Sequence, residues 1–375
     1  MSLDEEMIFT KSRSVTVAII YQNKDVTTDI APYLTAFTFT DNSTDNSDDI
    51  SFTLQDRKGL WLDDWFPAKG DKVRCSIVLD DTKAQSLPCG LYEVDQIDYS
   101  APPKTITIKA VSTAITKGMK SEKHSRAWED TGIRTIAGDI ANSNGLALYF
   151  DAEDVQIGRR EQISTSDIEF LSGICRDYDL AVKVNEGKLI IYDEELNEDK
   201  ESVAILDVTD PKIISWRFST KAANVYKKAV IKYHNAAKDE TFTAEENDDS
   251  VEGSERVLYV HQFTESLKDA KKKAHKKLKK ANQAEVNGSI TMMGDIRFRA
   301  GVNISVTGFG KFSGKFTVSK ATHTVGSGYT TTLELTQGST AKKASNARKK
   351  KKQSKGGGEL YYTGDRYYGN DKSGG

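Results

Sequence analysis

The chain has 375 residues, is 37% hydrophobic and 29% charged, and carries a formal net charge of −2. Its length allows two or three domains of about 100–200 residues each. No apolar run approaches the roughly 20 residues that a membrane span needs. The acidic opening MSLDEEMIFTKSRS lacks the apolar segment of a secretory signal. Cys75, Cys89 and Cys175 have no CxxC spacing, which argues against a disulfide framework and suits a reducing cytoplasm.

The charge is unevenly distributed. Residues 268–280 carry a net charge of +7 and residues 342–355 carry +8, so the rest of the chain carries −17. The sequence therefore predicts an acidic body with two concentrated basic segments.

The first third reads as short strands with alternating apolar residues. The alternating sets are Val15/Val17/Ile19, Phe37/Phe39, Ile50/Phe52/Leu54 and Val73/Cys75/Ile77. Turn-forming clusters separate them at 41–49, 67–71 and 99–104. We therefore predict an antiparallel, tube-like β domain over residues 1–118.

Residues 119–200 mix helices and strands and predict a small α+β insertion. A helix with an apolar stripe follows Asp130 and Thr131, either of which we expect as its N-cap, and it ends at Asn144–Gly145. A strand, a second helix after Ser164–Ser166 and a hairpin at 185–187 complete the pattern.

From residue 201 to 340 the pattern returns to strands, interrupted by one lysine-rich helix within 262–285. Its narrow apolar stripe is Leu267, Ala270, Ala274, Leu278 and Ala281, which suits close approach to a flat surface. We predict a second tube-like β domain here. The stretch 341–375 is rich in Lys, Gly and Tyr and predicts a flexible, extended tail.

The two β regions share a spacing of glycines and apolar residues. The matches are Gly70/Val73 with Gly301/Ile304, Gly90/Val94 with Gly314/Val318, Ile106/Ile108 with Leu333/Leu335, and Ser112 with Ser339. Any β meander can produce such matches, so a chance echo stays open beside a true duplication. The glycines predict structural turns at Gly70, Gly90, Gly301, Gly308, Gly310 and Gly314.

No pattern indicates catalysis, a cofactor or a metal. GFGKFSG at 308–314 is one residue too long for a dinucleotide fingerprint and lies between strands, so it predicts a hairpin turn. DNSTDNSDD at 41–49 resembles a calcium loop, but Phe52 stands where the bidentate Glu should be. The five histidines are scattered, and Cys175 lies on an apolar helix face. We therefore expect that this protein is not an enzyme.

The lysine-rich segments leave several readings open. Basic segments can bind nucleic acid or anionic lipid, but the helix stripe lacks large aromatic residues. We favour docking on an acidic surface of the same assembly over stable nucleic-acid binding, and a merely solvated face is an equal alternative.

Both ends of the folded region resemble late control protein D–like phage proteins. The stretches are LTAFTFTDNSTDNSDDISFTLQDRKGLWLDDWFPAKGDKV and GDIRFRAGVNISVTGFGKFSGKFTVSKATHTVGSGYTTTLEL, and with the helix between them they cover roughly residues 14–340. These proteins are the tail hubs of contractile phages, R-type bacteriocins (tailocins) and related injection systems.

The resemblance implies a structural virion protein assembled in the bacterial cytoplasm and released as part of a tail particle. It implies a homotrimer whose six β modules join a sixfold tail tube to a threefold spike, the spike being a separate protein, among other baseplate components. Tyrosines are favoured interface anchors, so Tyr361, Tyr362, Tyr367 and Tyr368 are candidate docking residues for the spike or another baseplate protein. The alternatives are a tail-associated peptidoglycan hydrolase and a nucleic-acid-binding protein.

Overall fold

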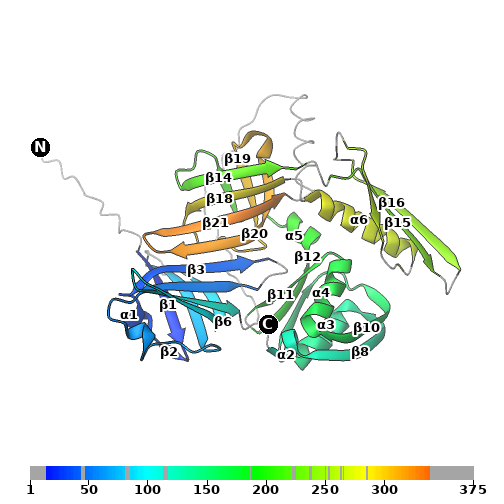
Figure 1. The fold of residues 1–375 in the computed structure, drawn as a ribbon. Coiled ribbons are helices and arrows are strands. Elements are labelled where there is room, and N and C mark those ends of the chain that lie inside the picture. The colour runs from blue at the N-terminus through cyan, green and yellow to red at the C-terminus, as the bar shows by residue number, and fades with distance from the viewer. Residues whose placement is uncertain are drawn as a thin grey trace, which may run out of the picture.

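The structure, a computed structural model, describes residues 14–337 except 44–46, 81–84, 113–116, 186, 222–224, 236–238, 250, 252–253, 262–263, 265 and 284–285. The predicted tail at 341–375 lies outside the described residues. The predicted fold class is confirmed for the rest: two β modules precede and follow a small α+β domain in the chain, and in space the two modules lie side by side (Figure 1).

The first module is built from strands with one apolar face, as the alternating pattern predicts. Its elements are β1 (Ser14–Tyr21), β2 (Lys24–Asp25), α1 (Thr27–Ile30), β3 (Leu34–Asn42), β4 (Asp49–Gln55), η1 (Leu60–Leu62), β5 (Lys72–Asp80), β6 (Gln85–Ser100) and β7 (Thr105–Ser112). Their inward side chains, among them Phe37, Ile50 and Ile77, form one buried hydrophobic cluster. The cluster holds the strands together by burying apolar surface.

The second module has its own hydrophobic cluster, which includes Phe298, Ile290 and Leu333. Its elements are β13 (Ala204–Asp207), β14 (Ile213–Thr220), β18 (Val286–Met293), β19 (Asn303–Thr307), η2 (Gly310–Phe312), β20 (Gly314–Val325) and β21 (Tyr329–Gln337). The predicted GFG hairpin turn lies between β19 and β20.

The two modules repeat the same strand order. The first reads β3-β4-β7-β6-β5-β1 and the second β14-β18-β21-β20-β19-β13. The outermost strands differ, since β1 is antiparallel to β5 whereas β13 is parallel to β19. The backbone N–H of Gly70 donates to the Val94 carbonyl at 2.8 Å, and that of Gly301 donates to the Val318 carbonyl at 2.8 Å. The duplication is therefore real.

One part of the predicted alignment was wrong. Val94 lies opposite Ala110, and Val318 lies opposite Leu335. Leu335 therefore corresponds to Ala110, and Leu333 to Ile108, two residues beyond the positions that the sequence match gave. Side chains alternate along a strand with period 2, so a match shifted by two residues keeps the same apolar alternation and the sequence pattern does not reveal the shift.

The middle domain packs two helices on short sheets. Its elements are α2 (Lys117–Ser121), β8 (Lys123–Gly132), α3 (Ile133–Ser143), β9 (Ala147–Asp151), β10 (Gln156–Ser166), α4 (Asp167–Asp177), β11 (Leu180–Asn185), β12 (Lys188–Asp193) and α5 (Glu194–Asp199). The Ser166 side chain caps α4 by accepting from the Glu169 N–H. The expected cap at Asp130 or Thr131 is wrong, because both belong to strand β8 and the helix begins only after Gly132, which is its N-cap.

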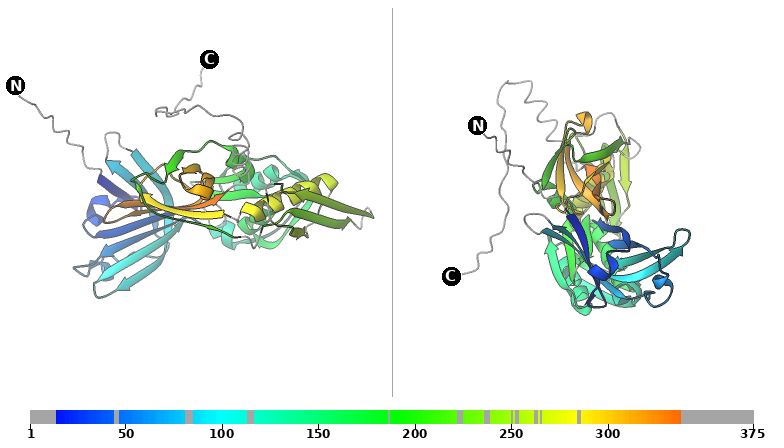
Figure 2. Two further views of the ribbon diagram at one scale, coloured as in Figure 1. Left: turned by 90° about the horizontal axis from the view of Figure 1, so that it is seen from above. Right: turned by 90° about the vertical axis from the view of Figure 1, so that its left-hand side faces the viewer.

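An extension is inserted between β14 and β18. It consists of β15 (Lys228–Asn235), β16 (Glu240–Asn247), β17 (Val257–Val260) and the lysine-rich helix α6 (Leu267–Gln283). Ala270, Ala274 and Leu278 of the predicted stripe pack on this small sheet, whereas Leu267 at its start is 46% exposed. Figure 2 shows the β15–β16 hairpin projecting at the end of the molecule opposite the first module.

Candidate functional site

The described residues contain no group of three His, Cys, Asp or Glu side chains placed to hold a metal ion. The three cysteines are free and buried. Burial raises the thiol pKa of Cys89 and of Cys175 to about 12, so both stay protonated and unreactive at neutral pH. No described helix is long and apolar enough to span a membrane. The informative features are contacts between parts of the chain and its unpaired sheet edges.

The two modules join through one continuous sheet of 13 strands. The second half of β20 pairs antiparallel with β3, from Lys320 opposite Asn42 to Val325 opposite Phe37. We call this pairing the module junction. At its centre the His323 ring stacks on another aromatic ring, with 5.9 Å between the centroids of His323 and Phe39.

His323 is fully buried and neutral. The Phe298 carbonyl can only accept, so His323 Nε2 carries the proton and donates to it at 2.9 Å. Nδ1 then accepts, with the Tyr329 hydroxyl at 2.8 Å and the Thr331 hydroxyl at 3.2 Å. Burial lowers the pKa of His323 to about 4. The junction therefore rests on an uncharged histidine with both nitrogens satisfied.

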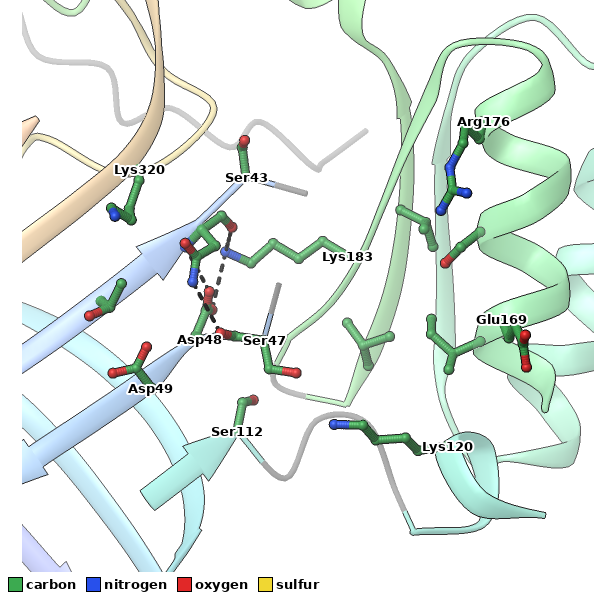
Figure 3. A pocket seen from close by; sticks show the side chains of 16 residues that line it. Ser43, Ser47, Asp48, Asp49, Ser112, Lys120, Glu169, Arg176, Lys183 and Lys320 are labelled. Carbon is green, nitrogen blue, oxygen red and sulfur yellow. Dashed lines mark hydrogen bonds and ion pairs between the residues drawn. The ribbon is translucent and has the colours of Figure 1, made fainter. Parts of the chain in front are cut away.

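The end of β3 also anchors the middle domain. Lys183 of β11 reaches the carboxylate of Asp48, with its Nζ 3.1 Å away (Figure 3). It also forms an ion pair with the carboxylate of Asp41. Asp41 accepts a further hydrogen bond of 3.0 Å from the backbone N–H of Ala300 in the second module. The Asp41 carboxylate of the first module thus contacts both the middle domain and the second module.

The charges of Lys183, Asp41 and Asp48 shift the pKa values of Lys183 and Asp48. Burial lowers the pKa of Lys183, but the two carboxylates outweigh that effect and raise it. Burial raises the pKa of Asp48 to about 6, with Lys183 offsetting only part of the shift. Two carboxylates share one ammonium, so the second is incompletely neutralised. The acidic turn that resembles a calcium loop therefore supplies two carboxylates to a lysine.

A pocket of about 960 Å³ opens beside the anchor (Figure 3). Its lining mixes Lys120, Arg176 and Lys320 with Asp49 and Glu169. Charges of both signs favour neither an anion nor a cation. The pocket does not indicate a catalytic centre.

The lysines of α6 dock on acidic residues of the middle domain in the same chain. Lys276 donates to the Asp193 carboxylate and to the Tyr178 carbonyl, both at 2.8 Å. Lys279 lies 2.9 Å from Glu195, and Lys280 contacts Glu194 and Asp179. The prediction of docking on an acidic surface is right, and that surface is the chain itself.

Two of the sheet edges that are open among the described residues lie on β14 and β6 of the large sheet. β14 pairs with β18 alone, and Ile214 and Trp216 on it are 59% and 49% exposed. β6 pairs with β5 only up to Glu93, so the segment Asp95–Ser100 has a strand, β7, on one side only. Unpaired N–H and C=O groups on such edges bind another strand readily. We call these the β14 edge and the β6 edge.

The predicted turn glycines fall mostly at connections. Gly70 and Gly301 have φ of +89° and +86°, which favours glycine over other residues. Gly308 and Gly310 lie between β19 and β20, and Gly314 begins β20. Gly90 is a correction: it lies inside β6, where the register with β5 shifts at a bulge, and not in a turn.

The four candidate docking tyrosines, Tyr361, Tyr362, Tyr367 and Tyr368, lie outside the described residues. The sequence reasoning missed His323, Lys183 and the two open edges. The only sequence signal for them was the His in the C-terminal family motif and the acidic turn at 41–49. The histidine and the acidic turn each contact residues that are distant in the sequence, so neither signal identifies its partners.

Comparison with known proteins gives matches in sequence. A family model described as YQBQ-like matches residues 162–336. The chain is 26% identical over 175 residues to the probable baseplate hub protein of Escherichia phage P2, covering 46% of this chain and 43% of that protein. It is 25% identical over 170 residues to the probable baseplate hub protein of Escherichia phage 186, covering 45% and 42%. The match thus spans less than half of these relatives.

The fold likeness extends further along the chain. The tail protein from Neisseria meningitidis MC58 matches with a TM-score of 0.67 at 13% identity, covering 88% of this chain and 98% of that protein. Sequence and fold agree, and they confirm the resemblance of this chain to phage tail hub proteins.

Proposed function

We propose that this chain is the structural, non-enzymatic baseplate hub of a contractile tail or injection particle. Three copies form a ring of six similar β modules, which meets a hexameric tail tube on one side and a trimeric spike on the other. Residues 1–118 and 201–340 supply the ring modules, and residues 119–200 form the insertion between them.

The observation that carries this proposal is the internal repeat. Two modules with the same strand order lie in one chain and share one sheet. A threefold ring of such chains presents six similar units, so it can meet sixfold and threefold neighbours at once. The relatives with matching sequence bear the name baseplate hub protein, which supports the same role here.

Light scattering tests the ring. We expect a particle of three times the chain mass of 41.5 kDa at assembly concentrations. A stable monomer under those conditions contradicts the proposal.

The competing functions have direct tests. A zymogram on purified protein should show no peptidoglycan cleavage. A gel shift at low salt should show no stable DNA complex, because lysines of α6 are paired with Asp179, Asp193, Glu194 and Glu195. Cleavage in the first assay, or a salt-sensitive shift in the second, would favour the corresponding alternative.

The tail tyrosines enter the proposal as contacts to the spike or a neighbouring baseplate protein. Deleting residues 356–375 should lower spike incorporation while leaving the number of chains in the ring unchanged. Unchanged incorporation removes this role.

A further inference from the structure

The module junction inside the chain has a definite anatomy. β20 pairs with β21 along one side for nearly its whole length. On its other side, the first half pairs with β19 and the second half pairs with β3. One long strand therefore binds its own module with its first half and the next module with its second half.

β6 is the counterpart of β20 and divides in the same way. Its first half pairs with β5, and its second half pairs with β7 on the side that corresponds to β21. The side that corresponds to β3 in the module junction is the open β6 edge. Asp95, Gln96 and Asp98 on this edge are exposed.

β14 is the counterpart of β3. Each has a bulge at the same place against its neighbour, between Leu34 and Ala36 in β3 and between Ile213 and Ser215 in β14. β3 is covered on both sides, by β4 and β20, whereas β14 has β18 alone. The two open edges are therefore the two halves of a junction that the chain already makes once.

We propose that the β6 edge of one copy pairs antiparallel with the β14 edge of a second copy, which repeats the module junction between chains. This inference rests on the proposed ring and names the contact that closes it. The edges are unlike one another, so the contact is head-to-tail and every copy uses both.

Matching bulges fix the register. β6 has an extra residue between Val94 and Gln96 against β7, and β20 has one between Val318 and Lys320 against β21. Carried over from the module junction, the pairing Thr324–Thr38, His323–Phe39 and Thr322–Thr40 becomes three pairs between chains. They are Ser100–Arg217, Tyr99–Phe218 and Asp98–Ser219.

The side chains at these positions suit such a contact. Tyr99 opposite Phe218 replaces the stacked pair of His323 and Phe39 with another aromatic pair, which stabilises cross-strand neighbours. Asp98 and Arg217 are diagonal neighbours in this register, two positions apart on the same face, and carry opposite charges. Every copy of the chain carries both the β6 edge and the β14 edge, so a second copy can supply the partner for either edge.

Cysteine pairs test the register in the full-length protein. Directly opposed residues in antiparallel strands have Cα atoms about 4.5–5.5 Å apart, within disulfide range. The double variant Asp98→Cys/Ser219→Cys should form covalent oligomers up to the ring on mild oxidation. Each single variant should stay monomeric on a denaturing gel. The native cysteines are buried and leave this background low.

Two control pairs frame the result. Thr322→Cys/Thr40→Cys occupies the equivalent site inside the chain and should form a disulfide within one chain. Gln96→Cys/Arg217→Cys is out of register and should not cross-link. A trimer that forms without the Asp98–Ser219 cross-link overturns this pairing alone. Self-linking of Ser219→Cys, which indicates a twofold contact, overturns it too, and failure to form any oligomer overturns the ring as well.

Discussion

β3 and β14 occupy equivalent places in the two modules, but among the described residues β3 pairs with a strand on each side whereas β14 pairs on one side only. Phe37 of β3 is fully buried, whereas its counterpart Trp216 on β14 is 49% exposed. The strands share a bulge and a register with the next strand, so local structure does not cause the difference. The cause is β20, which covers β3 and has no described counterpart over β14. The edge of β3 is thus paired within the chain, whereas the equivalent edge of β14 is left unpaired in the part of the chain that the structure describes.

The covered edge also carries groups that the open edge lacks. Asp41 at the end of β3 binds Lys183 and Ala300, while its counterpart on β14 is the uncharged Thr220. His323 at the centre of the module junction corresponds to Tyr99 on β6. The chain therefore fixes its own junction with a buried histidine and an ion pair, and leaves an aromatic residue at the equivalent open site.

Truncating the buried aromatic residue should have the largest effect. Phe37→Ala removes a side chain that packs on Phe52 at a centroid distance of 5.2 Å, and we expect a loss of about 3–5 kcal/mol in the free energy of unfolding. Trp216→Ala should cost clearly less in the isolated chain, because half of the side chain already faces solvent. Equal losses in chemical denaturation would contradict the comparison of the edges.

Removing the lysine of the anchor tests the second difference. Lys183→Met leaves two buried carboxylates without their ammonium, which should cost about 3–5 kcal/mol of unfolding free energy. Lys188→Met, on the neighbouring strand β12 with an exposed side chain, is the matched control and should be nearly neutral. A loss below about 1 kcal/mol for Lys183→Met would show that the anchor contributes little.

The neutral histidine makes the module junction sensitive to acid. The pKa of His323 falls from 6.5 to about 4 on folding, so its contribution is fully present above pH 6.5 and is lost as pH falls through about 4. The loss amounts to about 3 kcal/mol. Asp48, whose pKa rises to about 6, acts in the opposite direction, since its contribution is lost as pH rises through about 6.

A variant separates the two groups. His323→Gln keeps Asp48, so any difference in pH dependence between this variant and the wild type belongs to the histidine. Between pH 7 and pH 4.5 the change in unfolding free energy should be more favourable in His323→Gln than in the wild type, because the variant lacks the loss that His323 causes and keeps the gain that Asp48 causes. The same pH dependence in both would mean that His323 does not stay neutral in the folded protein.

Charging the open edge should weaken assembly with little effect on the single chain. Trp216→Lys places a charge in the proposed contact, and we expect a loss of about 2 kcal/mol in association, or about 30-fold in affinity. Ile205→Lys is the control, because Ile205 is 70% exposed on β13, outside the proposed pairing. Sedimentation should show dissociation for Trp216→Lys alone, and equal behaviour of the two variants would exclude this edge as the contact.

The sequence predicted the local elements well because their signals are local. Apolar spacing located α3 and α6, Ser166 marked the start of α4, and the hairpin at 185–187 follows its turn residues. The ribbon of β8 and β10 was missed, since its exposed strands show no clear apolar alternation.

The candidate site could not be predicted, because it is made of long-range pairs. Lys183 and Asp41 lie 142 positions apart, and the stacking of His323 on Phe39 depends on which strand β20 meets. The open state of β14 is likewise a property of the whole sheet. The glycine repeat hinted at two modules, but only the strand order identified the edges that correspond.

Electron microscopy of the purified, assembled protein tests the central claim most directly. The account predicts a closed ring of three chains with six similar β modules, in which the density of β14 continues into the β6 edge of the neighbouring chain. A ring with another number of chains, or a trimer held together elsewhere while both edges stay open, would contradict it.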